Sequence, residues 1–63
     1  MDTTQRVYDY LKEHPGDSLD EIAIALQISS RSNVRYHLAK LAAEGRVIMP
    51  ANKHRMFRVK ETQ

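Results

Sequence analysis

The sequence predicts a mainly α-helical fold with a small β-hairpin, formed by a single domain of residues 1–63. Apolar residues recur every three or four positions in three stretches before Gly45, which is the spacing of helices that bury one face. Turn-forming residues separate these stretches. After Gly45 the apolar residues alternate with polar ones, which is typical of strands. We therefore expect three helices followed by two short strands.

The length and composition exclude several classes of protein. A chain of 63 residues has one small core, which supplies only about 3–5 kcal/mol of net stability, and it has no room for a small-molecule sensor domain. There is no cysteine, and the three histidines lack the spacing of metal ligands. The sequence shows neither a signal peptide nor a membrane span. We expect no metal, no cofactor, no membrane partner and a cytoplasmic location.

The first helix is predicted over residues 4–13. Val7 and Leu11 lie four positions apart on its apolar face, with Tyr10 beside them. The sequence Pro15-Gly16-Asp17 then breaks the chain, so the helix must end before it.

The second helix is predicted over residues 18–27. Ser18 and Glu21 have the spacing of a capping box, in which each side chain accepts a hydrogen bond from the backbone N–H of the other residue. The sequence Gln27-Ile28-Ser29-Ser30 supplies a polar turn that ends this helix and offers N-caps for the next one. The expected buried residues are Leu19, Ile22, Ala23 and Leu26.

The third helix is predicted over residues 32–44, with Gly45 as its left-handed C-terminal stop. Val34, Leu38 and Leu41 fall on one side at about 100° per residue and form its core face. The opposite side is narrow and carries small or polar residues, with Asn33 and Arg35 on its flanks. This outer face consists of Ser32, Tyr36, Ala39, Lys40 and Ala43.

A β-hairpin is predicted over residues 46–60. Val47 and Met49 in one strand, and Phe57 and Val59 in the other, should place apolar side chains on a common face. The outer face and the tip of the hairpin are basic. They contain Lys53, His54, Arg55, Arg58 and Lys60.

The charge of the chain is divided between its two halves. Residues 1–29 contain two basic and six acidic side chains, a net charge of −4, whereas residues 30–63 contain eight basic and two acidic, a net charge of +6. The basic residues are interleaved with apolar ones, so they decorate folded elements and do not form a basic tail. This asymmetry indicates a polyanion-binding surface on the C-terminal half, and nucleic acid is the first partner to consider.

Two stretches of the chain carry a family resemblance. Residues 22–29 read IAIALQIS, and residues 34–48 read VRYHLAKLAAEGRVI. Together with the order of elements, they resemble the winged helix-turn-helix superfamily. They look most like the DNA-binding domains of bacterial and phage repressors of the LexA and MarR types, whose frame is IA..L.IS...V..HL..L...G.I. The resemblance covers nearly the whole chain. Ile28 and Val34 are one residue further apart than is commonest there, which predicts an atypical turn.

The resemblance implies a sequence-specific double-stranded DNA-binding transcriptional regulator of the repressor type. Residues 32–44 would be the recognition helix in the major groove, and residues 50–58 of the hairpin, the wing, would contact the backbone. The residue chemistry agrees, because Arg35 can bond guanine twice and Asn33 can pair with adenine. The predicted DNA-binding residues are Ser30, Arg31, Ser32, Asn33, Arg35, Tyr36, Lys40, Lys53, His54, Arg55 and Arg58.

Two of the candidate residues have structural alternatives. Tyr36 either contacts DNA or packs its ring against the hairpin while its hydroxyl finds a partner. His37 lies at the edge of the core face and is expected to pack or to hydrogen-bond within the chain.

Functions other than DNA binding have less support in the sequence. No phosphate-binding loop, catalytic triad or paired carboxylates in an apolar setting is present, so no enzyme activity is expected. The main alternative is a protein–protein interaction or assembly module, which Ile24 favours because it points away from the core. A homodimer with Tyr8 and Ile24 at its interface would reconcile the two. A narrower alternative is left-handed duplex binding, as in Z-alpha domains, but the hairpin lacks tryptophan and paired prolines.

Overall fold

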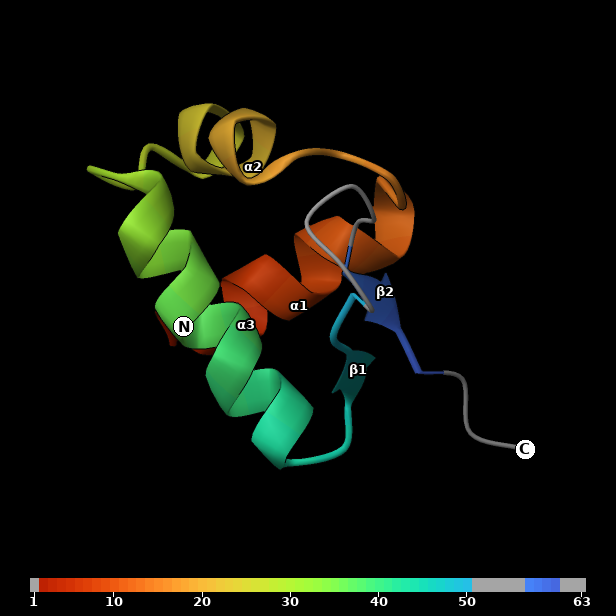
Figure 1. The fold of residues 1–63 in the computed structure, drawn as a ribbon. Coiled ribbons are helices and arrows are strands. Elements are labelled where there is room, and N and C mark those ends of the chain that lie inside the picture. The colour runs from red at the N-terminus through yellow and green to blue at the C-terminus, as the bar shows by residue number, and fades with distance from the viewer. Residues whose placement is uncertain (1, 51–56, 61–63) are drawn as a thin grey trace.

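The structure, a computed structural model, describes residues 2–50 and 57–60. Within them three helices precede two antiparallel strands (Figure 1). The elements are α1 (Thr3–Glu13), α2 (Leu19–Leu26), α3 (Arg31–Ala43), β1 (Val47–Ile48) and β2 (Arg58–Val59). The predicted fold class, mainly α with a small β-hairpin, is confirmed, and each helix end lies within one residue of its predicted bound.

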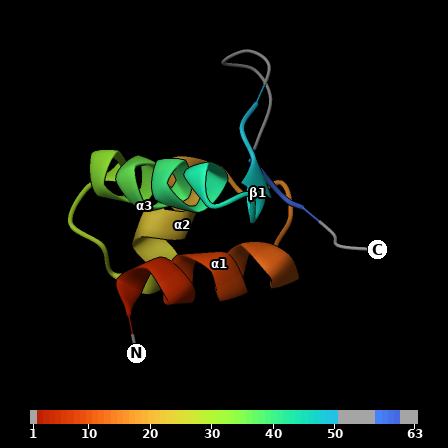
Figure 2. The same cartoon turned by 90° about the horizontal axis from the view of Figure 1, so that it is seen from below.

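The helices leave one side of α3 uncovered. Figure 2 shows α1 and α3 packed on each other, with α2 behind them and β1 beside the C-terminal end of α3. α3 packs against α1, α2 and β1, whereas β2 packs against α1. The side of α3 that faces away from α1 is therefore open to solvent.

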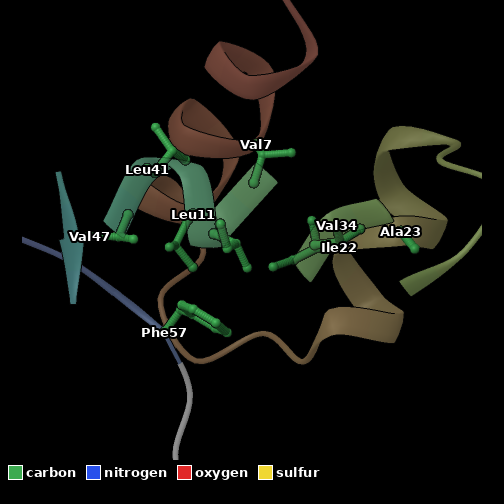
Figure 3. Close-up of a cluster of buried hydrophobic side chains, with 9 residues drawn as sticks. Val7, Leu11, Ile22, Ala23, Val34, Leu41, Val47 and Phe57 are labelled. Carbon is green, nitrogen blue, oxygen red and sulfur yellow. The ribbon is translucent and has the colours of Figure 1, made fainter. Parts of the chain in front are cut away.

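The core lies where the three helices meet the base of the hairpin (Figure 3). Its residues are Val7, Leu11, Ile22, Ala23, Val34, Leu38, Leu41, Val47 and Phe57. Leu38 is completely buried, and full burial of such a side chain stabilises the fold by about 1.5–3 kcal/mol. Leu19 and Leu26, which the sequence assigned to the core, lie half-buried at its edge. Thr4 is also buried, although it is polar.

The helix boundaries follow local chemistry. The capping box of α2 is present, with 2.7 Å from the Ser18 nitrogen to Glu21 Oε1 and 3.1 Å from the Glu21 nitrogen to Ser18 Oγ. After α3, Gly45 adopts a left-handed φ of 78°. The backbone N–H of Gly45 donates to the Ala42 carbonyl and that of Arg46 to the Leu41 carbonyl, and these two bonds form the Schellman motif that ends the helix. The turn between α2 and α3 comprises residues 27–30 and uses Gln27 in the same left-handed region, with a φ of 58°.

The hairpin is shorter than the alternation predicts. Val47 pairs with Val59, and Ile48 pairs with Arg58. The expectation that Met49 shares the buried face with Val47 is wrong, because β1 ends at Ile48 and Met49 is 46% exposed. Residues 51–56, with the predicted DNA contacts Lys53, His54 and Arg55, lie outside the described residues.

Candidate nucleic-acid interface

The outer face of α3 is exposed and has no acidic residue. Between Arg31 and Ala43 the helix contains three basic side chains and neither Asp nor Glu. Tyr36, near the middle of this face, is 63% exposed. The exposed residues that form the face are Ser32, Asn33, Arg35, Tyr36, Ala39, Lys40 and Ala43.

Arg35 and Lys40 flank this face from its two sides. Both are exposed, and within the described part of the chain neither makes a hydrogen bond or an ion pair. Ala39 and Ala43 between them add little bulk. The helix can therefore approach a flat or grooved surface closely, with both cations available to it.

The ring of Tyr36 contacts its neighbour on the helix. Its centroid lies 5.2 Å from that of His37, in an edge-on arrangement. His37 Nδ1 in turn shares a 2.8 Å hydrogen bond with Oγ1 of the buried Thr4 on α1. The expected intramolecular role of His37 is thus confirmed, since it joins α3 to α1.

Predicted contacts at the start of α3 already have partners within the chain. Ser30 caps the helix by accepting from the Asn33 backbone N–H at 3.4 Å. The Asn33 side-chain amide donates to Ser29 Oγ at 3.0 Å, so it must leave this exposed bond to pair with adenine. Arg31 Nη1 lies 3.6 Å from Asp20 Oδ2 on α2. Asn33 and Arg31 would therefore have to exchange these partners to contact DNA, whereas the Ser30 hydroxyl can still donate its own hydrogen.

Arg46 does not belong to the exposed basic surface. Its guanidinium carbon lies 4.1 Å from the centre of the Tyr8 ring, and its Nη2 donates to Gln5 Oε1 at 3.0 Å. Its Nη1 lies 3.6 Å from Glu44 Oε1. Arg46 is one of the eight basic residues of the C-terminal half, and in the structure it connects α1 to the start of the hairpin.

The two predicted dimer residues occupy different surroundings. Tyr8 is half-buried beneath Arg46, with Lys12 Nζ 5.6 Å from its ring centre. Ile24 is 78% exposed on α2. The two residues thus differ in exposure, and their role in a dimer stays a prediction.

The hairpin adds described cations beside α3. Arg58 and Lys60 are exposed, and the Lys60 backbone N–H donates to the Arg46 carbonyl at 2.9 Å. The chain that leaves β1 runs toward the side of α3 that faces away from α1 (Figure 2). The outer face of α3 and the chain directly after β1 thus lie on the same side of the molecule.

A shallow groove on the other side of the molecule has a different character. It is lined by Arg6, Asp9, Tyr10, Glu13 and Leu26, from α1 and α2. At its edge the Tyr10 hydroxyl donates to Asp17 Oδ2 at 2.7 Å, which raises the pKa of the phenol. Residues 2–50 and 57–60 contain no group of three or more potential metal ligands. None of their helices combines the length and apolarity that a membrane crossing requires.

No model of a known protein family, no curated protein and no solved structure matches this chain. The features of the structure that bear on function are therefore the outer face of α3 and the charges around it.

Proposed function

We propose that this chain is a sequence-specific double-stranded DNA-binding transcriptional regulator of the repressor type, with α3 in the major groove. The observation that supports this most is the outer face of α3, which is exposed, free of acidic residues and flanked by two cations without partners in the described chain. A fold does not require such a face, because like charges without partners do not stabilise it. A polyanion would complement it.

The roles on α3 follow from the chemistry of its side chains. The major groove admits one α-helix, and an arginine can donate two hydrogen bonds to a guanine edge there. Arg35 is our candidate for this base contact. Lys40 and the hydroxyls of Ser30 and Ser32 are assigned to phosphates, which position a protein without reading sequence. Tyr36 is exposed in the middle of the face and can contact a base edge or a phosphate.

The hairpin is assigned to the DNA backbone beside α3. Arg58 and Lys60 supply exposed cations in the described part of the hairpin. Lys53, His54 and Arg55 remain predictions from the sequence. A homodimer is part of the proposal, because a two-fold pair would place two recognition helices about 34 Å apart, one turn of DNA.

A selection of binding sites from random duplexes tests this proposal, combined with a size measurement of the bound species. We expect an enriched motif with two half-sites and two copies bound. If each chain neutralises four to six phosphates, the logarithm of the binding constant should fall with log salt at a slope of roughly −4 to −5. Failure to enrich any motif, or an affinity that does not change with salt, would count against DNA binding.

A second candidate function is a protein-interaction module, which Ile24 favours. It is the most exposed large apolar side chain in the described chain, and the acidic Asp20 and Glu21 precede it on α2. If two copies met through this face, these carboxylates would oppose each other, whereas a partner with a basic rim would complement them.

Replacing Ile24 by aspartate tests whether the chain self-associates through this face. Since Ile24 is outside the core, Ile24→Asp should leave thermal unfolding almost unchanged. Loss of dimer in sedimentation would place Ile24 at a self-association surface. A wild type that stays monomeric at high concentration and binds DNA as one copy per site would refute the dimer.

A further inference from the structure

One ion pair joins the acidic half of the chain to the proposed DNA-binding helix. Arg31, the first residue of α3, has its Nη1 3.6 Å from Oδ2 of Asp20, in the first turn of α2. Their side chains are 67% and 65% exposed. Arg31 is thus the one cation at the start of α3, and a carboxylate of the chain itself lies beside it.

The fold has little need of this pair. Exposed ion pairs contribute only about 0–1 kcal/mol to stability. The start of α2 is already capped by Ser18 and Glu21, and neither of these bonds involves Asp20. The pair therefore contributes little to the stability of the fold. It lies at the N-terminal end of α3, the helix that is proposed to bind DNA.

We infer that Asp20 lowers the affinity of this chain for DNA, because it competes with a backbone phosphate for Arg31. This inference rests on the proposed function. A phosphate that approaches Arg31 comes within a few ångströms of the Asp20 carboxylate. This separation is shorter than the Debye screening length of about 8–10 Å at physiological salt, so the two negative charges repel each other. Arg31 must then exchange its partner, and the displaced carboxylate still repels the phosphate.

The competition acts on every duplex alike. Phosphates carry no sequence information, so Asp20 weakens cognate and random DNA by the same factor. Binding in the cell then depends more on the base contact assigned to Arg35. Asp20, on α2, therefore limits the binding of the chain to DNA of random sequence.

The test is the variant Asp20→Asn, which keeps the shape of the side chain and removes its charge. Its matched control is Glu13→Gln, which changes the net charge equally at the end of α1, on the side of the molecule away from the outer face of α3 (Figure 2). Each variant is titrated with a preferred duplex and with a random duplex over a series of salt concentrations. The same titrations are repeated in an Arg31→Gln background. Thermal unfolding verifies that all variants are folded.

We expect Asp20→Asn to bind both duplexes about two- to fivefold more tightly, the range of one exposed ion pair, with a salt slope steeper by about 0.9, the value of one phosphate. Glu13→Gln should stay close to wild type. In the Arg31→Gln background the gain from Asp20→Asn should shrink.

Two outcomes would overturn the inference. If wild type binds duplex DNA but Asp20→Asn behaves as Glu13→Gln does, Asp20 does not compete and the proposed function still stands. If neither wild type nor Asp20→Asn binds any duplex at moderate salt, the proposed function fails and the inference fails with it.

Discussion

The acidic half and the basic half of this chain use their polar side chains differently. In α1, α2 and the turn between them, several of these groups bond to one another, as in the 2.7 Å bond from Tyr10 to Asp17 and the 2.9 Å bond from Gln5 to Asp9. On the outer face of α3, Arg35 and Lys40 have no such partners in the described residues. Polar groups that bond within the chain stabilise the fold, whereas like charges without partners in the chain indicate a surface that binds another molecule.

Arg46 and Asp20 are charged residues with contacts across this division. Arg46 belongs by sequence to the basic half, but it bonds Gln5 and lies over Tyr8 in the acidic half. Asp20 belongs to the acidic half, but it pairs with Arg31 at the start of α3. The division by charge is therefore a good first guide to function and a poor guide to any single residue.

The largest effect is expected from the core that both halves share. Leu38 is fully buried, so Leu38→Ala should leave a cavity that costs about 2–5 kcal/mol, comparable with the whole stability of so small a domain. Circular dichroism during heating should show a chain that is unfolded or close to it, which also abolishes DNA binding. Lys40→Ala, exposed on the same helix, should melt as wild type does. A normal transition for Leu38→Ala would mean that α3 is rotated relative to the structure.

The next effect concerns the unpartnered cations. Arg35→Ala should cost roughly 1–3 kcal/mol of binding to a preferred site and should flatten discrimination there, without changing the melting temperature. Arg58→Ala on the hairpin should instead weaken cognate and random duplexes equally. Titrations of both variants with the two duplexes make this comparison. If Arg35→Ala lowers the affinity for both duplexes equally, Arg35 contacts only phosphate.

Arg46 should behave in the opposite way to Arg35. Arg46→Met removes the hydrogen bond to Gln5 and the contact with the Tyr8 ring, and should lower the free energy of unfolding by about 1–2 kcal/mol. Urea unfolding measures this, with Arg58→Met, which also removes one cation, as the control. A destabilisation no larger than that of Arg58→Met would place Arg46 among the surface charges.

The smallest effect appears at alkaline pH. The hydrogen bond to Asp17 raises the pKa of Tyr10, and partial burial and the charges of Asp17 and Glu21 act in the same direction. When the pKa of a tyrosine is higher in the folded chain than in the unfolded chain, it stabilises the folded chain at pH values below the unfolded pKa of about 10. This stabilisation is lost as the pH rises through the pKa of the folded chain. Wild type should therefore lose stability above about pH 10 more steeply than Tyr10→Phe.

The control for the alkaline experiment is Tyr36→Phe. The Tyr36 hydroxyl makes no hydrogen bond within residues 2–50 and 57–60, so this variant should keep the wild-type decline in urea unfolding at each pH. Profiles for Tyr10→Phe and wild type that run parallel would show that the bond to Asp17 has no part in the stability of the folded chain.

Helices, caps and most of the core were predictable because they depend on neighbours in the sequence. The capping box of Ser18 and Glu21 spans three residues, and the stop at Gly45 needs only a glycine after an apolar stripe. The stripe of α3 identified Val34, Leu38 and Leu41 as buried, and the exposure of Ile24 follows from the same periodicity. The outer face of α3 was predicted as the complement of that stripe. The prediction that Met49 is buried was wrong, because the alternation of apolar and polar residues continues in the sequence beyond Ile48, where β1 ends.

The sequence by itself thus determined the three helices, their ends and their buried faces, since each of these follows from spacings of three or four residues, and its composition determined the charge asymmetry. Only the tertiary structure decided which charges are free. The contacts of Arg46 with Gln5, of His37 with Thr4 and of Arg31 with Asp20 join residues that lie 41, 33 and 11 positions apart. Such contacts depend on the angles at which helices cross, and packing of the whole core sets those angles.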